Sequence, residues 1–367
     1  MTLSDYDISV ISTPYFPQPS EFMGAVEKVS FQRFQELGKF GYRVNFIAPI
    51  SSRNDQVNLQ SIRLARPSKV PDNRNIIRWM FSTRSFDYFM PYLNIPKDKI
   101  GKIVFLDGWR LEPWDFFSLN HKLRHSYIIN ILHPPVIFID RFAIRSLSFL
   151  YKSSNWGALN LRIHEYFLQK GYTSYYLPNG INIPDKNRII RNSDEFLIFF
   201  GRIEPSKAPH LAIKLARNLG IPLKIYGRIH DYEYFVSKIK PYLDTQNIMF
   251  YGEVSYVELF ESLRNAKGTV YFSDAYDPLP TVLLESISYG VPVIGYGAHP
   301  LSGFHDVIKG KVNGVLVKSA DITSSFSKRR LLDDLDLINR LSVYDWAQKN
   351  WSWNNIIKTY YVPFLDK

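Results

Sequence analysis

Short apolar runs alternate with longer amphipathic stretches along this chain, and the alternation occurs in two sets. Such a pattern is typical of β-α units arranged around a parallel sheet. The first set predicts a helix with Val26, Val29, Phe34 and Leu37 inward, and strands at residues 7–11, 43–48, 103–106 and 127–132. The second predicts helices at 210–218, 257–264 and 281–288, and strands at 195–200, 223–226, 248–251, 269–272 and 291–294. The sequence therefore predicts an α/β fold with two successive domains.

The boundary between these domains is expected at Leu177-Pro178-Asn179-Gly180, because proline and glycine end regular structure. A chain of 367 residues also exceeds what one ordinary hydrophobic core accommodates. We therefore expect a first domain at residues 1–178 and a second that begins at residue 179. Residues 53–98 are rich in Arg, Asn and Pro, and there the pattern does not choose between loop and short helices.

Cysteine is absent from the chain, which excludes disulfides and thiolate metal sites. The N-terminal residues do not form a secretory signal pattern, since Asp5 and Asp7 interrupt it. No segment approaches the ~18 to 20 uncharged apolar residues that a membrane-spanning helix needs. We therefore expect a cytoplasmic protein.

The formal net charge of +11 suits nucleic acid, an anionic membrane surface or a phosphate-rich substrate. The sequence has no metal-finger spacing and no aromatic single-strand motif, so we expect no nucleic-acid partner. One basic and aromatic stretch fits either an amphipathic helix on the core or a surface resting peripherally on the cytoplasmic membrane face. Its residues are Arg141, Phe142, Arg145, Leu147, Phe149, Leu150, Lys152, Trp156 and Arg162.

One polar cluster follows a predicted strand, at the strand end where α/β proteins bind ligands. Gly201-Arg202 comes directly after that strand, and Lys207 comes five residues after Arg202. Arginine can grip a diphosphate through two parallel N–H bonds, and lysine adds a mobile charge. The same residues are equally compatible with an ordinary basic loop at the surface.

Two further clusters lie near predicted helix starts, whose free N–H groups attract anions. Asp277 and Glu285 flank a helix start after Pro280, and carboxylates accept hydrogen bonds from the vicinal hydroxyls of a sugar or ribose. Acidic groups also favour a helix N-terminus for structural reasons alone. Gly24 stands at another helix start, where a glycine permits close approach of a ligand or simply makes a turn.

Several motifs in this order resemble glycosyltransferase family four, whose fold is GT-B. They are Gly201-Arg202-Ile-Glu-Pro-Ser-Lys207, Asp277 and Glu285 eight apart, Ser286-Ile-Ser-Tyr-Gly290-Val-Pro292, Leu177-Pro178-Asn179-Gly180, Asp306 followed by Gly314, and Trp351-Ser-Trp353 through Tyr360. The match is specific over residues 177–317, fair at 5–48 and 343–364, and nearly absent between 50 and 125.

The resemblance implies two Rossmann-like domains facing each other across a cleft, with a C-terminal helix that crosses back to the first domain. Residues 344–367 would then join residues 1–178 in the acceptor-side domain, and residues 179–343 would bind the nucleotide-sugar. The implied reaction moves a hexose-type sugar from a UDP- or GDP-sugar to a glycan, lipid-linked or other hydroxyl acceptor. Configuration at the anomeric carbon would be retained.

The resemblance also assigns roles to individual residues. Arg202 and Lys207 would hold the donor diphosphate, Asp277 would face the transferred sugar, and Glu285 would bind the ribose hydroxyls. His133 would lie beside the reacting sugar. The other donor-binding positions would be Gly24, Gly201, Leu279 and Thr281. No metal or other cofactor is implied, because the cationic side chains stabilise the leaving diphosphate.

Two departures from the family pattern concern the second cluster. Asp277 stands where the family usually has glutamate and is one methylene shorter, and Pro280 stands at a family glycine and removes a backbone donor. Asp334-Leu-Asp336 has the spacing of metal-dependent transferases, but its amphipathic surroundings favour a solvated helix face.

Other activities remain open from the sequence. A nucleotide-sugar epimerase would convert donor without an acceptor, and a phosphorylase would need lysine-bound pyridoxal phosphate. The positive charge leaves a basic nucleic-acid-binding protein as an alternative of another class.

Overall fold

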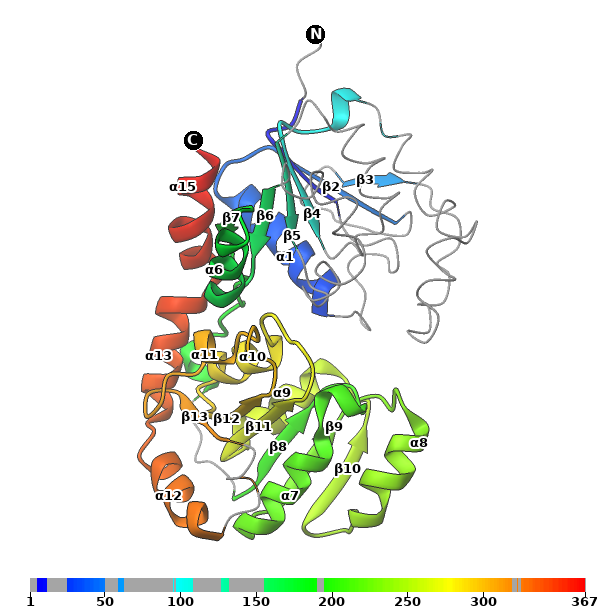
Figure 1. Cartoon of the computed structure of the whole chain (residues 1–367), viewed down its shortest axis with the longest axis vertical. Helices are drawn as coiled ribbons and strands as arrows, with labels where there is room; N and C mark the ends of the chain where they lie inside the picture. The colour runs from blue at the N-terminus through cyan, green and yellow to red at the C-terminus, as the bar shows by residue number, and fades with distance from the viewer. Residues whose placement is uncertain are drawn as a thin grey trace. The chain divides into compact units, whose positions relative to one another are not determined.

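The computed structural model describes residues 5–11, 25–49, 59–62, 95, 97–107, 127–131, 155–189, 195–318, 322 and 325–366. The chain forms two compact units, which we call unit 1 (Met1–Asn179 with Tyr360–Lys367) and unit 2 (Gly180–Thr359). Both are drawn in Figure 1. The chain therefore passes from unit 1 to unit 2 between Asn179 and Gly180, and it returns to unit 1 at Tyr360.

The sequence-based division assigned residues 344–359 to the first domain, and the structure corrects this assignment. They belong to unit 2, because α13 (Arg340–Trp351) packs against α10 (Thr281–Ser288). The chain then continues through α14 (Trp353–Ile356) and a π-helical turn, η9 (Ile357–Tyr361), to α15 (Val362–Leu365). Backbone hydrogen bonds join Ile181 N–H to the Trp351 carbonyl at 2.8 Å and Trp353 N–H to the Ile181 carbonyl at 3.2 Å. The start and the end of unit 2 thus lie side by side.

Within the described residues, unit 1 contains a seven-stranded parallel sheet in the order β3-β2-β1-β4-β5-β6-β7. The strands are β1 (Ile8–Ile11), β2 (Val44–Pro49), β3 (Leu59–Ile62), β4 (Ile103–Asp107), β5 (Tyr127–Ile131), β6 (Asn155–Ala158) and β7 (Thr173–Tyr176). Four of them were expected within one residue at each end. β3, β6 and β7 were not predicted, because their short segments lack a run of branched aliphatic residues.

Besides α15 and the end of η9, two helices and a short turn complete the described part of unit 1. They are α1 (Ala25–Lys39), α6 (Leu161–Gln169) and the 3₁₀ turn η2 (Lys97–Lys99). Val29, Phe34 and Leu37 of α1 are buried as expected, whereas Val26 is only half-buried. Asn160 caps α6 by accepting a hydrogen bond from the Ile163 N–H at 2.9 Å.

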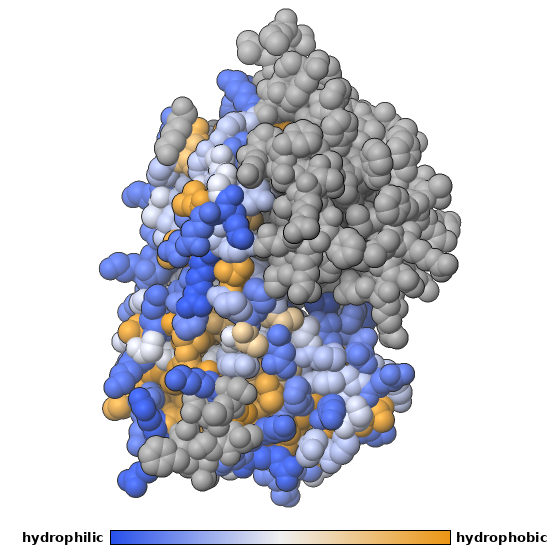
Figure 2. Space-filling model, viewed as in Figure 1, coloured by the Kyte–Doolittle hydropathy of each residue, from blue (hydrophilic) through white to orange (hydrophobic). Residues whose placement is uncertain are grey.

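Of the basic and aromatic stretch, only Trp156 and Arg162 lie among the described residues, and Arg162 is half-buried in α6. Trp156 lies in β6 with no exposed area, and its ring stacks on Phe167 of α6 at 5.5 Å. It is a core residue and faces no membrane. Arg141, Phe142, Arg145, Leu147, Phe149, Leu150 and Lys152 lie outside the described residues. None of the helices among the described residues has both the length and the apolar character needed to cross a bilayer. The face of unit 2 drawn in Figure 2 mixes hydrophilic and hydrophobic side chains.

Unit 2 contains, within the described residues, a six-stranded parallel sheet in the order β10-β9-β8-β11-β12-β13. The strands are β8 (Leu197–Phe200), β9 (Leu223–Tyr226), β10 (Ile248–Gly252), β11 (Gly268–Ser273), β12 (Val293–Gly297) and β13 (Gly314–Leu316). β8 and β11 are buried along their whole length, as central strands of a covered parallel sheet should be.

Helices cover this sheet between the strands. α7 (Pro209–Leu219) packs on β8, β9 and β11, and α10 packs on β11 and β12. The other helices are α8 (Tyr232–Tyr234), α9 (Tyr256–Asn265), α11 (Phe304–Val307) and α12 (Ser325–Asp336), with short turns η4 (Lys186–Arg188), η5 (Pro205–Lys207), η6 (Phe235–Ile239) and η7 (Lys240–Tyr242). The prediction of two α/β sheets following each other is confirmed.

Candidate functional site

The strand order of unit 2 places two of the sequence clusters together. Order reverses between β8 and β11, which are neighbours in the sheet although β9 and β10 come between them in the chain. In open α/β sheets, ligands bind outside the carboxyl ends of the strands at such a switch point. Gly201-Arg202 directly follows β8, and Asp277 stands four residues after the end of β11. Both clusters therefore emerge at the reversal.

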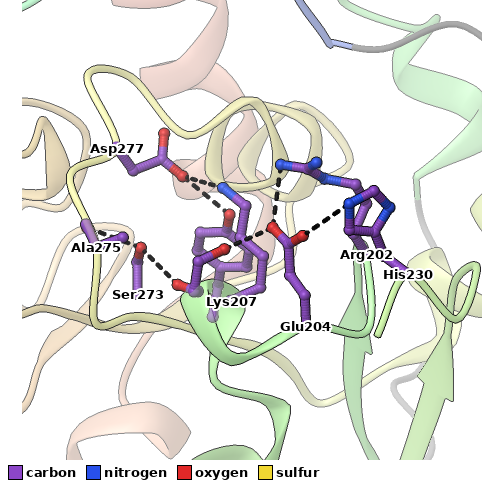
Figure 3. A network of polar contacts seen from close by, with 9 residues as sticks. Arg202, Glu204, Lys207, His230, Ser273, Ala275 and Asp277 are labelled. Atoms are coloured by element: carbon purple, nitrogen blue, oxygen red, sulfur yellow. Dashed lines mark hydrogen bonds and ion pairs between the residues drawn. The ribbon is translucent and has the colours of Figure 1, made fainter. Parts of the chain in front are cut away.

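Lys207 and Asp277 are in direct contact. Lys207 ends the turn η5, and its Nζ lies 2.6 Å from Oδ2 of Asp277. The hydroxyl of Tyr271, on β11, donates to the same oxygen at 3.0 Å. The Lys207 ammonium also stands over the Tyr271 ring, 5.6 Å from its centroid. Figure 3 shows Lys207 and Asp277 of this group, whose charged side chains are mostly buried.

Lys207 and Tyr271 both hold their protons more tightly than usual. Burial works to lower the pKa of Lys207, but the charges of Asp277 and Tyr271 and their hydrogen bonds outweigh it, so this pKa lies above its ordinary value. Burial, together with the Asp277 charge, also raises the pKa of Tyr271. Lys207 is consequently a cation and Tyr271 a neutral hydroxyl donor throughout the neutral pH range.

Arg202 is held next to this group by a second carboxylate. Its guanidinium lies 3.0 Å from Oε1 of Glu204, while 57% of the Arg202 side chain remains exposed. Ser206 donates to the same oxygen at 2.5 Å, and Nε2 of His230 lies 3.6 Å from Oε2. Glu204 itself is buried. Glu204 is part of the motif Gly201 to Lys207, but the sequence did not identify it as a site residue.

The ends of three neighbouring strands come close together beside Arg202. Gly201 N–H donates to the Tyr226 carbonyl at 3.0 Å, and Gly227 N–H donates to the Gly252 carbonyl at 2.7 Å. A Cβ at Gly227 would stand 1.8 Å from the carbonyl oxygen of Gly201, so no other residue fits there. The lack of a side chain at Gly227 therefore lets these strand ends pack closely against each other. The sequence predicted Gly201 as a site residue but not Gly227 or Gly252.

The loop carrying Asp277 is fixed by the segment before α11. The Asp277 N–H donates to Oγ of Ser302 at 3.0 Å, and the Gly303 N–H donates to the Asp277 carbonyl at 3.0 Å. A Cβ on Gly303 would lie 2.2 Å from the Pro278 carbonyl oxygen. Ser302 and Gly303 were not predicted, because only the folded chain brings them to Asp277.

α10 begins directly behind this loop. Pro280 precedes it with φ −63° and ψ 110°, and no side chain caps the helix. Thr281 is the first helical residue, Leu279 is buried just before it, and Glu285 is buried one turn further along. The uncapped N–H groups at this end favour an anion. The structure thus brings Arg202, Lys207 and Asp277 into one network, and it places Leu279, Thr281 and Glu285 on the segment that continues from Asp277.

The remaining predicted positions have different outcomes. Gly24 and His133 lie outside the described residues. Asp336 of the Asp334-Leu-Asp336 pair ends α12, is 61% exposed, and pairs with Lys267 at 2.7 Å. Among the described residues no group of three or more His, Asp or Glu side chains is arranged to hold a metal ion.

Residues 182–335, which include the whole unit 2 sheet, match a family model described as Glycosyl transferases group 1. The chain is a glycosyltransferase. The matched residues contain Arg202, Lys207, Asp277 and Glu285, so the network described above lies inside this glycosyltransferase domain. No curated protein matches the chain.

Solved structures resemble the glycosyltransferase over nearly its whole length. Sucrose-phosphate synthase of Thermosynechococcus elongatus has a TM-score of 0.71 at 15% identity, covering 98% of this chain and 99% of that one. HepE of Anabaena, in complex with UDP and glucose, has a TM-score of 0.70 at 13% identity, covering 99% and 100%. The apo lipopolysaccharide outer core galactosyltransferase WaaB has a TM-score of 0.65 at 16% identity, covering 95% and 96%. These likenesses establish the GT-B fold.

Proposed function

We propose that the enzyme transfers a hexose-type sugar from a UDP- or GDP-sugar to a hydroxyl of a glycan or lipid-linked acceptor, with retention of anomeric configuration. The observation that carries this proposal is the Lys207–Asp277 contact at the switch point, with Arg202 beside it. A cation fixed against a carboxylate, next to an exposed guanidinium, suits a sugar diphosphate, which has both hydroxyls and phosphate charge. HepE was solved with UDP and glucose, which supports a nucleotide-sugar donor.

In the proposed reaction, the bond between the anomeric carbon and the diphosphate oxygen breaks first. The leaving diphosphate takes the electron pair, and Arg202 and Lys207 neutralise the charge that grows on it. The acceptor hydroxyl attacks the oxocarbenium-like centre from the same face and passes its proton to the departing phosphate. Fixed positive charge in a partly buried site lowers the energy of this transition state without the reorganisation that water would need.

The other roles follow the chemistry of each side chain. Asp277 accepts a hydrogen bond from the transferred sugar, and Glu285 accepts from the ribose hydroxyls. The backbone from Leu279 to Thr281 and at Gly201 contacts the diphosphate. Gly24 serves donor binding and His133 serves catalysis, the roles that the family resemblance implies. No metal is required in this scheme, because two cationic side chains neutralise the phosphates. The proposal includes a cytoplasmic location, as expected from the sequence.

A thermal-shift screen of nucleoside diphosphates and their sugars tests the proposal. One nucleotide class should stabilise the wild type, by about 2.7 kcal/mol at a hundredfold excess over its dissociation constant. Arg202→Ala and Glu285→Ala should respond much less. Arg217→Ala is the matched control, since Arg217 stacks on Tyr242 at 5.4 Å. Equal shifts in all four proteins would contradict the residue roles.

A second measurement separates transfer from its rivals. Consumption of donor should require an added hydroxyl acceptor and should be unchanged by excess chelator. Conversion of the donor without an acceptor would instead support a nucleotide-sugar epimerase. A salt-sensitive gel shift with nucleic acid, without any nucleotide-sugar binding, would support a nucleic-acid-binding protein.

A further inference from the structure

Tyr271 occupies a position where a phenylalanine would satisfy the core. It lies in β11 with 2% of its surface exposed. Its ring is nearly parallel to the ring of Phe199 on β8, with the ring centroids 6.3 Å apart. It is also nearly parallel to the ring of Phe304 on α11, with the centroids 5.9 Å apart. Burying a hydroxyl in such an aromatic stack costs free energy unless a hydrogen bond compensates. The partner of this hydroxyl is the Asp277 carboxylate.

The two donors on Asp277 converge on one oxygen. Lys207 Nζ and the Tyr271 hydroxyl both contact Oδ2, at 2.6 Å and 3.0 Å. Oδ1 accepts no hydrogen bond from any described side chain, and Figure 3 shows the second oxygen of Asp277 directed away from Lys207. The carboxylate is therefore held by one oxygen and presents the other.

The backbone of Asp277 is fixed as well. Ser302 and Gly303 bind its N–H and its carbonyl, each at 3.0 Å, so the remaining freedom of Asp277 is rotation of its short side chain. Lys207 alone would be a weak guide, because its ammonium is a point charge on a flexible stem. The Tyr271 hydroxyl is attached to a ring wedged between Phe199 and Phe304, so it supplies a fixed direction.

We propose that Tyr271 is a positioning residue for sugar transfer: its hydroxyl fixes Oδ2 of Asp277 so that Oδ1 faces the sugar of the donor. This inference rests on the proposed function. Asp277 is one methylene shorter than the glutamate the family motif usually has, so it reaches the sugar from fewer orientations. The tyrosine hydroxyl selects the productive one. A bare nucleoside diphosphate lacks the transferred sugar that Asp277 faces, so its binding does not depend on Tyr271.

The test compares Tyr271→Phe with the wild type in two assays. Removing the hydroxyl should lower kcat for transfer by about 10- to 100-fold, the range for a lost hydrogen bond to a charged group. The dissociation constant of the bare nucleoside diphosphate should change less than about twofold. Tyr344→Phe is the matched control, because it removes a buried hydroxyl bonded to the Pro184 carbonyl at 2.8 Å. It should leave both quantities unchanged.

A double variant tests whether Tyr271 acts through Asp277. In an Asp277→Ala background, adding Tyr271→Phe should produce no further loss of kcat. Additive losses in the double variant would overturn the proposal. A Tyr271→Phe enzyme with wild-type kcat, or with equal losses of transfer and nucleotide affinity, would overturn it as well. Failure of Tyr271→Phe to fold would also overturn it. If the wild type neither binds a nucleoside diphosphate nor transfers sugar, the proposed function itself fails. If the wild type is functional and Tyr271→Phe has the same kcat as the wild type, only this inference is rejected.

Discussion

The Nε of Arg33 donates a hydrogen bond to the hydroxyl of Tyr361 across 2.9 Å, although 328 positions separate the two residues in the chain. The same guanidinium forms a buried ion pair with Asp107 and donates to Oδ1 of Asn179 at 2.6 Å. Arg33 comes from α1, Asp107 ends β4, and Asn179 ends the first pass through unit 1. One buried cation therefore ties the returning C-terminal segment to the interior of unit 1.

The Tyr361 hydroxyl extends this cluster to the connection between the units. It lies 3.2 Å from the Leu177 carbonyl and 3.3 Å from the Pro178 carbonyl. Burial alone would lower the pKa of Arg33, but the charges of Asp107 and Tyr361 raise it, so Arg33 stays a cation. A buried charge with several partners is costly to leave unpaired.

Replacing Arg33 with methionine should destabilise unit 1. It leaves the Asp107 carboxylate buried without its cation, a change that costs about 3 to 5 kcal/mol. Denaturant unfolding followed by circular dichroism measures the loss. Arg43→Met is the matched control, because Arg43 pairs with Asp7 at 2.8 Å at the surface of the same unit. The control should change stability little, and equal losses in both variants would contradict a special role for the buried cluster.

Tyr361 should make stability fall at alkaline pH. Burial, partly offset by Arg33, raises its pKa from 10.0 to about 12. The folded state holds this proton more tightly, so the stabilisation is fully present below pH 10 and is lost as pH rises through about 12. At pH 11 the unfolded chain gains about 1.4 kcal/mol from ionising this group. Tyr361→Phe should therefore show a shallower decline between pH 10 and 12, measured by unfolding at several pH values. An unchanged slope would rule out this linkage.

Gly303→Ala should impair catalysis. The added methyl would stand 2.2 Å from the Pro278 carbonyl oxygen, so the loop carrying Asp277 must shift. A displacement of about 1 Å in a catalytic group can lower activity by about 100-fold. Steady-state transfer kinetics measure this. Gly310→Ala is the control, since a Cβ there meets nothing within 4 Å. Similar kinetics for both variants would show that the loop accommodates the methyl group.

Lys207→Ala should lower kcat by about 100- to 1,000-fold, the usual effect of removing one group that stabilises transition-state charge. It also leaves Asp277 without its cation, so thermal unfolding should be recorded alongside the kinetics. Lys186→Ala is the matched control for Lys207→Ala, because Lys186 pairs with Asp345 at 2.9 Å on the surface of the same unit. An enzyme that keeps wild-type kcat without Lys207 would contradict its assignment.

Several elements could be predicted because local sequence decides them. The expected strand at 223–226 and helix at 281–288 coincide with β9 and α10, where Pro222 and Pro280 mark the start and apolar residues repeat with the right period. β6 was misread as part of an amphipathic stretch, because Trp156 and its basic neighbours mimic a surface helix. Only the sheet order shows that Trp156 is interior.

The sequence by itself determined the two α/β sets, the enzyme class and which charged side chains follow the strand ends, because periodicity and motif order are local properties. The tertiary structure decided which of these side chains come into contact. Lys207 and Asp277 stand 70 residues apart, and they touch because β8 and β11 are adjacent in the sheet. No sequence pattern singled out Tyr271, and only its packing between Phe199 and Phe304 aims its hydroxyl at that carboxylate. Such pairings depend on strand order and packing, which spacing along a chain does not encode.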